Sequence, residues 1–188
     1  MKKTALILIL CLTACLLFGC GRDNTETTRP DVDLSIQPLE GEPVPVDTSR
    51  LKRFDLSCGL TFYGGKELKI QPTEGMAAYL SNSVQIVMII EEPKAGSVLE
   101  GKSLEEYADL LTGNNGLTPC VYDKYGNLAT AYLADSDADD GQFYYYVTVK
   151  ETEESFWLVQ MICRDTHAST YSDMYAQWSS TLSATPQS

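Results

Sequence analysis

The sequence predicts an α+β domain, in which an antiparallel β-sheet carries helices packed on its faces as an α/β/α sandwich. Three observations lead to this prediction. Residues 84–90 and 155–164 are apolar on both alternating faces, which a strand tolerates only when both sides are covered. Short strands separated by turn signals between residues 120 and 164 indicate an antiparallel meander. Two amphipathic helical patterns, near Ser103 and Tyr171, supply the covering layers.

The first residues have the layout of an export signal. Two lysines precede an apolar run from Ala5 to Phe18, in which only Thr13 is polar, and small residues follow. The run is shorter than the roughly 20 residues that a membrane-spanning helix needs, and no basic stop-transfer cluster follows it. We therefore predict a signal peptide over residues 1–19.

The segment Leu17-Phe18-Gly19-Cys20 resembles the lipobox of bacterial lipoproteins. In that family the cysteine receives a diacylglyceryl group and a signal peptidase cuts before it. The resemblance implies an acyl anchor such as palmitate on Cys20, which would hold the protein on the extracytoplasmic face of a bacterial membrane. Cys15 ends a second match, but apolar residues follow it, whereas a polar tether follows Cys20. An ordinary secreted protein is the other alternative.

Composition divides the rest of the chain. Residues 20–50 hold the lipidated cysteine and a stretch rich in proline, threonine and acidic residues, without apolar periodicity, which predicts a disordered tether. Apolar runs punctuated by turn signals begin at Leu51 and predict one domain over residues 51–184, large enough for a single core. Residues 185–188 form a tail.

The net charge is −12, and loss of the two signal-peptide lysines makes it about −14. Lysine and arginine contacts to phosphate dominate nucleic-acid affinity, so this charge excludes nucleic acid as a partner. The same charge opposes peripheral attachment to anionic lipids and leaves a covalent lipid as the route to the membrane.

Three cysteines remain in the predicted domain: Cys58, Cys120 and Cys163. Three thiols cannot all pair with one another, so one disulfide with a free thiol, and three buried thiols, both stay open. A structural zinc or a thioredoxin-type centre is not expected, because there is no CxxC motif and only one histidine.

The elements follow in order along the domain. Residues 59–63 and 76–80 predict early strands, and residues 84–90 predict a central strand covered on both faces. Ser103 and Glu106 form a capping box that begins a helix, which Gly113 is expected to end. Three antiparallel strands at 120–123, 127–134 and 142–150 come next, then a strand at 155–164 and a closing helix from Tyr171 to Leu182.

These elements, together with particular residues, resemble the PsbP-like superfamily, which also includes a nuclear Ran-binding protein of the Mog type and many small bacterial lipoproteins. The matching pieces cover most of residues 51–184, and they are residues 59–62, 103–109, 126–127 with Ala129, 156–157 and 171–178. The motif that often follows the first strand in that family is replaced here by Gly64-Gly65. The resemblance implies an accessory or adaptor role without catalysis, and no binding residues transfer with it.

The acidic turn from Asp135 to Gly141 invites a calcium interpretation but departs from the EF-hand pattern. Glycine stands at the seventh position and Tyr146 at the twelfth, where a bidentate glutamate is required. A solvated hairpin turn is favoured, and we predict no metal site and no cofactor.

Cys163 and His167 are the one pair of a thiol and a base close in sequence, but the cysteine is expected inside the sheet and the histidine in a loop. The sequence contains none of the common hydrolase, nucleotide-binding or dinucleotide-binding motifs. We therefore predict no catalytic residues and no enzyme, with an unrecognised hydrolase as a remote alternative.

Phe143, Tyr144, Tyr145 and Tyr146 alternate along one predicted strand. We expect Phe143 and Tyr145 to pack inward, and Tyr144 and Tyr146 to face the other layer or a groove. Any ligand surface is therefore expected at Tyr144 and Tyr146. The functional prediction is a lipid-anchored binding or accessory module for another envelope component, which the resemblance implies is a protein. The alternative is a lipoprotein that binds a small ligand or a glycan.

Overall fold

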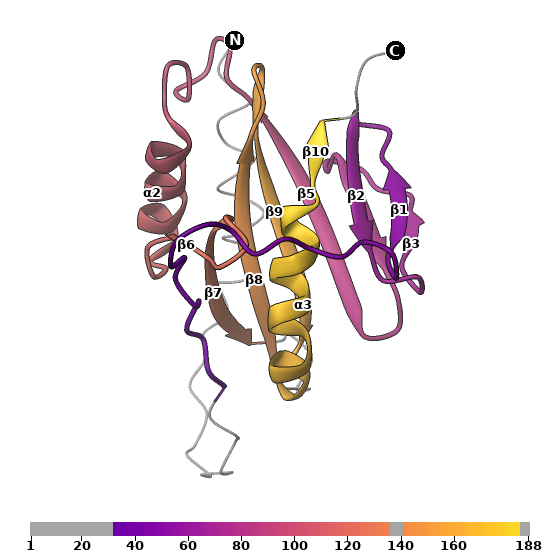
Figure 1. The fold of residues 1–188 in the computed structure, drawn as a ribbon. Helices are drawn as coiled ribbons and strands as arrows, with labels where there is room; N and C mark the ends of the chain where they lie inside the picture. The colour runs from indigo at the N-terminus through magenta and orange to yellow at the C-terminus, as the bar shows by residue number, and fades with distance from the viewer. Residues whose placement is uncertain (1–31, 136–140, 185–188) are drawn as a thin grey trace.

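The computed structural model describes residues 32–135 and 141–184, and within these ranges it shows two antiparallel sheets with two α-helices (Figure 1). This confirms the predicted α+β class. The larger sheet has the strand order β3-β4-β5-β9-β8-β7-β6. Its strands are β3 (Lys69–Gln71), β4 (Ala78–Ser81), β5 (Gln85–Pro93), β6 (Val121–Tyr122), β7 (Leu128–Asp135), β8 (Gln142–Glu151) and β9 (Ser155–Arg164).

A smaller sheet lies beside the start of β5 and the end of the closing helix (Figure 1). It pairs β2 (Leu60–Gly64) with β1 (Lys52–Asp55) on one side and with β10 (Ser183–Ala184) on the other. Phe62 on β2 is fully buried and packs edge-on against Trp178, with ring centroids 6.3 Å apart. The small sheet therefore closes one end of the main core.

Helix α2 (Leu104–Asn115) begins at the predicted capping box. The Ser103 hydroxyl accepts from the Glu106 amide at 3.2 Å, and the Glu106 carboxylate accepts from the Ser103 amide at 2.9 Å. The helix runs past Gly113 and ends at Gly116, whose φ of 63° is left-handed. The predicted stop was therefore wrong, because the chain needs a left-handed residue only at Gly116.

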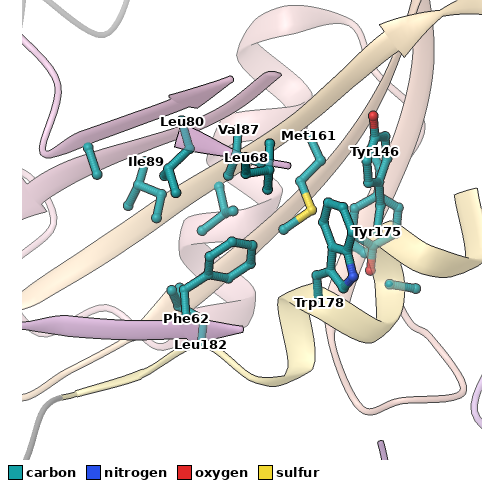
Figure 2. Close-up of a cluster of buried hydrophobic side chains, with 14 of the residues drawn as sticks. Phe62, Leu68, Leu80, Val87, Ile89, Tyr146, Met161, Tyr175, Trp178 and Leu182 are labelled. Carbon is teal, nitrogen blue, oxygen red and sulfur yellow. The ribbon is translucent and has the colours of Figure 1, made fainter. Parts of the chain in front are cut away.

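Helix α3 (Ala168–Ser180) follows a short 3-10 turn, η1 (Asp165–His167), and lies across β8 and β9 (Figure 1). Beneath it the larger of two apolar clusters joins both sheets (Figure 2). Its central side chains are fully or nearly fully buried and include Phe62, Leu80, Val87, Met161, Tyr175 and Trp178. The second cluster lies between α2 and the opposite face of the sheet, where Tyr107 stacks on Phe156 at 4.6 Å.

Strand β9 is buried on both faces, as predicted, because α3 covers one face and α2 the other. Strand β5 differs from its prediction. Val87 and Ile89 on the α3 side are fully buried, whereas Ile86, Met88 and Ile90 on the other side are only half-buried. The reason is the position of α2, whose apolar contacts centre on β7, β8 and the start of β9.

The chain is ordered on the domain well before residue 51, so the predicted tether of residues 20–50 is too long. Val32 and Ile36 pack against the larger cluster. Pro38 forms an isolated antiparallel β-bridge with Asp123, and the Leu39 amide donates to the Tyr122 carbonyl at 2.8 Å. This segment, indigo in Figure 1, thus follows the edge of the sheet at β6 before it reaches β1. Composition does not predict this pairing, because a segment that is held by backbone hydrogen bonds needs few apolar residues.

Within the described ranges, none of the helices is long and apolar enough to cross a membrane.

Candidate functional site

An open groove of about 690 Å³ lies between α3 and the turn that joins β4 to β5. One wall is the side of α3 that carries Tyr171, Met174 and Trp178. The opposite wall consists of the β4–β5 turn and the start of β3. The groove therefore lies between α3 and the end of the sheet at which β4 turns into β5.

The β4–β5 turn is held by the side chain of Asn82. Its Oδ1 accepts from the backbone amides of Val84 and Gln85, at 2.8 and 2.7 Å. Because two amides fix which end of the Asn82 amide is the oxygen, Nδ2 is directed away from the turn and donates to Oε1 of Gln85 at 2.8 Å. The orientation of the Gln85 amide is therefore also fixed.

Gln85 is the most unusual side chain of the groove. It is only 6% exposed, lines the groove, and its Nε2 has no hydrogen-bond acceptor among the described residues. Burial raises the pKa of the neighbouring Tyr175, and the Gln85 side chain beside its hydroxyl opposes that rise. The Tyr175 hydroxyl donates to the Ile162 carbonyl at 2.9 Å, and its oxygen remains able to accept from an amide. Because the Nε2 atom is itself enclosed, it is part of the packed layer beneath α3 and is not open to the groove.

The α3 wall is aromatic and packed. The Tyr171 ring stacks on Tyr175 with centroids 5.9 Å apart, and Tyr175 lies 5.8 Å from Trp178. A Cβ at Gly65 would lie 3.1 Å from Cη2 of Trp178, so the loop before β3 closes against the indole. The wall is therefore held in place from both sides.

A second polar cluster is buried where the β6–β7 turn, β8 and α3 meet. Asp123 is 2% exposed and accepts from the backbone amides of Tyr125 and Asn127, from the Asn127 side chain and, at 2.6 Å, from the Tyr146 hydroxyl. Asn127 also donates to the Ala176 carbonyl on α3 and accepts from Lys150 at 2.8 Å. All these groups have partners, so the cluster is a structural junction.

Glu92 on β5 is the one carboxyl in the described part of the chain whose pKa rises strongly. Burial under α2 raises its pKa to about 7, and the Tyr107 hydroxyl beside it partly opposes the rise. Because the pKa of this carboxyl is near 4.5 in the unfolded chain, the folded state binds the proton more tightly than the unfolded state does. The resulting stability is present at acidic pH and is lost as pH rises towards 7 and above.

We expect Glu92→Gln, which keeps the side chain neutral, to stabilise the protein at pH 8 by about 1–2 kcal/mol, after a discount for partial exposure. At pH 4.5 the variant and the wild type should unfold alike. Urea unfolding at both values checks this, with the exposed Glu91→Gln as the control. An equal effect of Glu92→Gln at the two pH values would contradict the assignment.

The predicted ligand surface at Tyr144 and Tyr146 is wrong. These side chains are 2% and 1% exposed and lie in the larger cluster beneath α3 (Figure 2 shows Tyr146). Phe143 and Tyr145, predicted to point inward, are the half-buried pair, and Tyr145 stacks on Tyr132 at 4.7 Å. In the register of β8 on β9, Tyr144 lies opposite Cys163 and Tyr146 lies opposite Met161. This register turns Tyr144 and Tyr146 towards α3.

The structure does not build a nucleophile from Cys163 and His167. Burial raises the pKa of the Cys163 thiol to about 11, although the Tyr175 hydroxyl lowers it, while the exposed His167 packs its ring against Tyr171. Cys58, Cys120 and Cys163 are all free thiols. Burial also raises the pKa of Cys58, and that of Cys120 to about 11, which makes each a poor nucleophile at neutral pH.

The predicted lipidation site Cys20 lies outside the described residues, and so does most of the acidic turn predicted as a solvated hairpin turn, of which only Asp135 and Gly141 are described. In the described ranges, no three cysteine, histidine or acidic side chains gather as a metal site would require.

Gln85 is not predicted as a site residue, because in the sequence it is a polar residue near the start of an apolar strand. The one signal was the position of Gln85, three residues after Asn82 in a turn where asparagine commonly accepts from the backbone. That pattern predicts the turn but not the burial of the glutamine.

No family model and no curated protein matches the sequence. Among solved structures, a Bacteroides thetaiotaomicron protein is 11% identical with a TM-score of 0.53, over 73% of this chain and 50% of that one. A cyanobacterial PsbP (CyanoP) from Synechocystis is 10% identical with a TM-score of 0.44, over 77% and 98% of the two chains. The Saccharomyces cerevisiae Ran-binding protein Mog1p is 8% identical with a TM-score of 0.46, over 75% and 97%. The chain therefore shares its fold with the Bacteroides protein and spans half of it.

Proposed function

We propose that this protein is a bacterial lipoprotein, anchored through Cys20 on the extracytoplasmic face of a membrane, whose PsbP-like domain binds or assists another envelope component without catalysis. The observation that carries the anchoring is the segment Leu17-Phe18-Gly19-Cys20 behind an apolar run that is too short to span a bilayer. A single acyl chain binds membranes only marginally, so two or three chains on one cysteine are needed to hold the domain there.

Substitution of Cys20 tests the anchor. We expect Cys20→Ser to abolish incorporation of a clickable palmitate analogue and to move the protein out of the membrane fraction, because the serine hydroxyl cannot form the thioether. Cys15→Ser is the matched control and should keep both the label and the membrane position. Persistence of the label in Cys20→Ser, or its loss in Cys15→Ser alone, would refute the assignment.

Crosslinking in intact membranes tests the accessory role. A stoichiometric protein partner recovered with the wild type supports it, whereas recovery with an envelope polymer alone supports the second candidate, a lipoprotein that binds a small ligand or a glycan. One observation favours that second candidate: the open groove beside α3 is lined by aromatic residues of the helix on one side and by polar residues of the β4–β5 turn on the other.

A further inference from the structure

We propose that the outer edge of β1 pairs with the same edge of a second copy of this chain. The small sheets of the two copies would then join into one antiparallel sheet, across a two-fold axis that passes beside Phe54. β1 is the edge strand of the small sheet (Figure 1), and no strand of the described residues pairs with its outer side. The pairing goes beyond the proposed function and uses neither Cys20 nor the groove beside α3.

The backbone of β1 directs hydrogen-bonding groups towards this outer side. On the neighbouring strand β2, the amide of Tyr63 donates to the Thr181 hydroxyl at 3.0 Å and so points away from β1. Tyr63 lies opposite Arg53, and residues opposite each other in an antiparallel pair either bond to each other or both turn away. Arg53 therefore turns its N–H and C=O groups outward, and so does Asp55, which is the next residue but one. Such an unpaired edge is a template for another strand.

The side chains at the same positions are self-complementary in charge. Arg53 and Asp55 are 50% and 62% exposed and form an ion pair at 2.7 Å. Antiparallel pairing centred on Phe54 sets Arg53 opposite Asp55 of the second copy, and Asp55 opposite Arg53 of that copy. Opposite charges directly across two strands stabilise their pairing. The Arg53 guanidinium and the Thr61 hydroxyl both contact Oδ1 of Asp55, so Oδ2 has no partner among the described residues and is available to the second copy.

The open edge of the larger sheet, at β3, is protected against such pairing, whereas the edge at β1 is not. β3 has 3 residues, Pro72 follows it without an amide hydrogen, and the Leu68 amide before it donates to the Gly65 carbonyl at 3.1 Å. Charged residues also protect an edge when like charges would meet there. In β1 the spacing of Arg53 and Asp55 brings unlike charges together instead, so this charged edge favours a second copy.

Charge reversal on both sides of the pairing tests this proposal. The full-length protein is studied by sedimentation in a density-matched zwitterionic detergent at about 1–300 µM, because a short edge buries less surface than a tight dimer does. We expect the wild type to form dimers in this range. Arg53→Asp alone and Asp55→Arg alone should each weaken self-association about tenfold or more, because like charges would meet across the strands. An equimolar mixture of the two variants should associate as the wild type does, because each reversed side chain then faces its complement.

Two controls keep the test decisive. Glu153→Arg makes the same change of net charge as Asp55→Arg, at an exposed position between β8 and β9, and it should leave self-association unchanged. Each β1 variant should melt within about 2 °C of the wild type, since an exposed ion pair contributes little to stability. A wild type that stays monomeric, as expected if the edge receives a strand of another protein, overturns the proposal. Self-association that survives either reversal, or a mixture that does not associate, overturns it as well.

Discussion

Asp123→Ala is expected to lower the free energy of unfolding by about 3–5 kcal/mol. The substitution removes an acceptor that serves two backbone amides, the Asn127 side chain and the Tyr146 hydroxyl, all within the buried junction. Burial lowers the pKa of Lys150, and the negative charge of Asp123 opposes that fall. The substitution removes this charge as well. The Tyr146 hydroxyl and the two backbone amides would then be buried without this acceptor, and the Lys150 ammonium would keep Asn127 but lose the nearby negative charge.

Equilibrium urea unfolding, followed by tryptophan fluorescence, measures this loss. Tyr146→Phe deletes a single hydroxyl from the same junction and should cost about 1–2 kcal/mol. Asp47→Ala is the matched control, because Asp47 is exposed and accepts only from Ser49 nearby, and it should change stability by less than about 0.5 kcal/mol. A loss below that of Tyr146→Phe would show that the junction does not depend on the carboxylate.

Phe62→Ala is expected to cost about 3–5 kcal/mol. The ring is fully buried where the small sheet meets the main core, with its centroid 6.0 Å from that of Phe54 and 6.3 Å from that of Trp178. Figure 2 shows Phe62 and Trp178 in this cluster. Its edge also fills the space over Gly64, where a Cβ would lie 2.7 Å from Cε1 of Phe62. Removal of the ring leaves a cavity that neighbouring rings fill poorly.

The same urea experiment checks this second prediction. Phe62→Leu keeps most of the apolar volume and should lose about half as much or less. Ile70→Ala, at a side chain that is 53% exposed on the sheet edge, is the control and should stay within about 0.5 kcal/mol of the wild type. Similar losses for Phe62→Ala and Ile70→Ala would show that the small sheet contributes no core.

Much of the fold could be predicted because its signals are local. The capping box at Ser103 and Glu106 forms between residues three apart, so it needs no tertiary information. The alternation along residues 155–164 places Trp157 and Met161 on one face and Phe156 and Leu158 on the other. The first face belongs to the larger apolar cluster and the second to the cluster under α2. By contrast, the ordering of residues 32–50 depends on backbone pairing with a strand far along the chain, which composition does not report.

The candidate site could not be predicted, for a related reason. Alternation separates Tyr144 and Tyr146 from Phe143 and Tyr145, but both sets are aromatic. Which set turns towards α3 depends on the register of β8 on β9 and on where the helix returns to the sheet. Likewise the burial of Gln85 depends on α3, whose residues lie more than eighty positions later in the sequence.

The sequence by itself determined the α+β class, the principal strands, the beginning of α2 and the prediction of a lipid anchor at Cys20, since each depends on neighbouring residues and their periodicity. Only the tertiary structure decided which aromatic side chains are buried, that residues 32–50 pair with the edge of the sheet, and that the Gln85 side chain is enclosed beneath α3. Burial and hydrogen-bond pairing are properties of segments brought together from distant positions, and a local pattern contains no record of them.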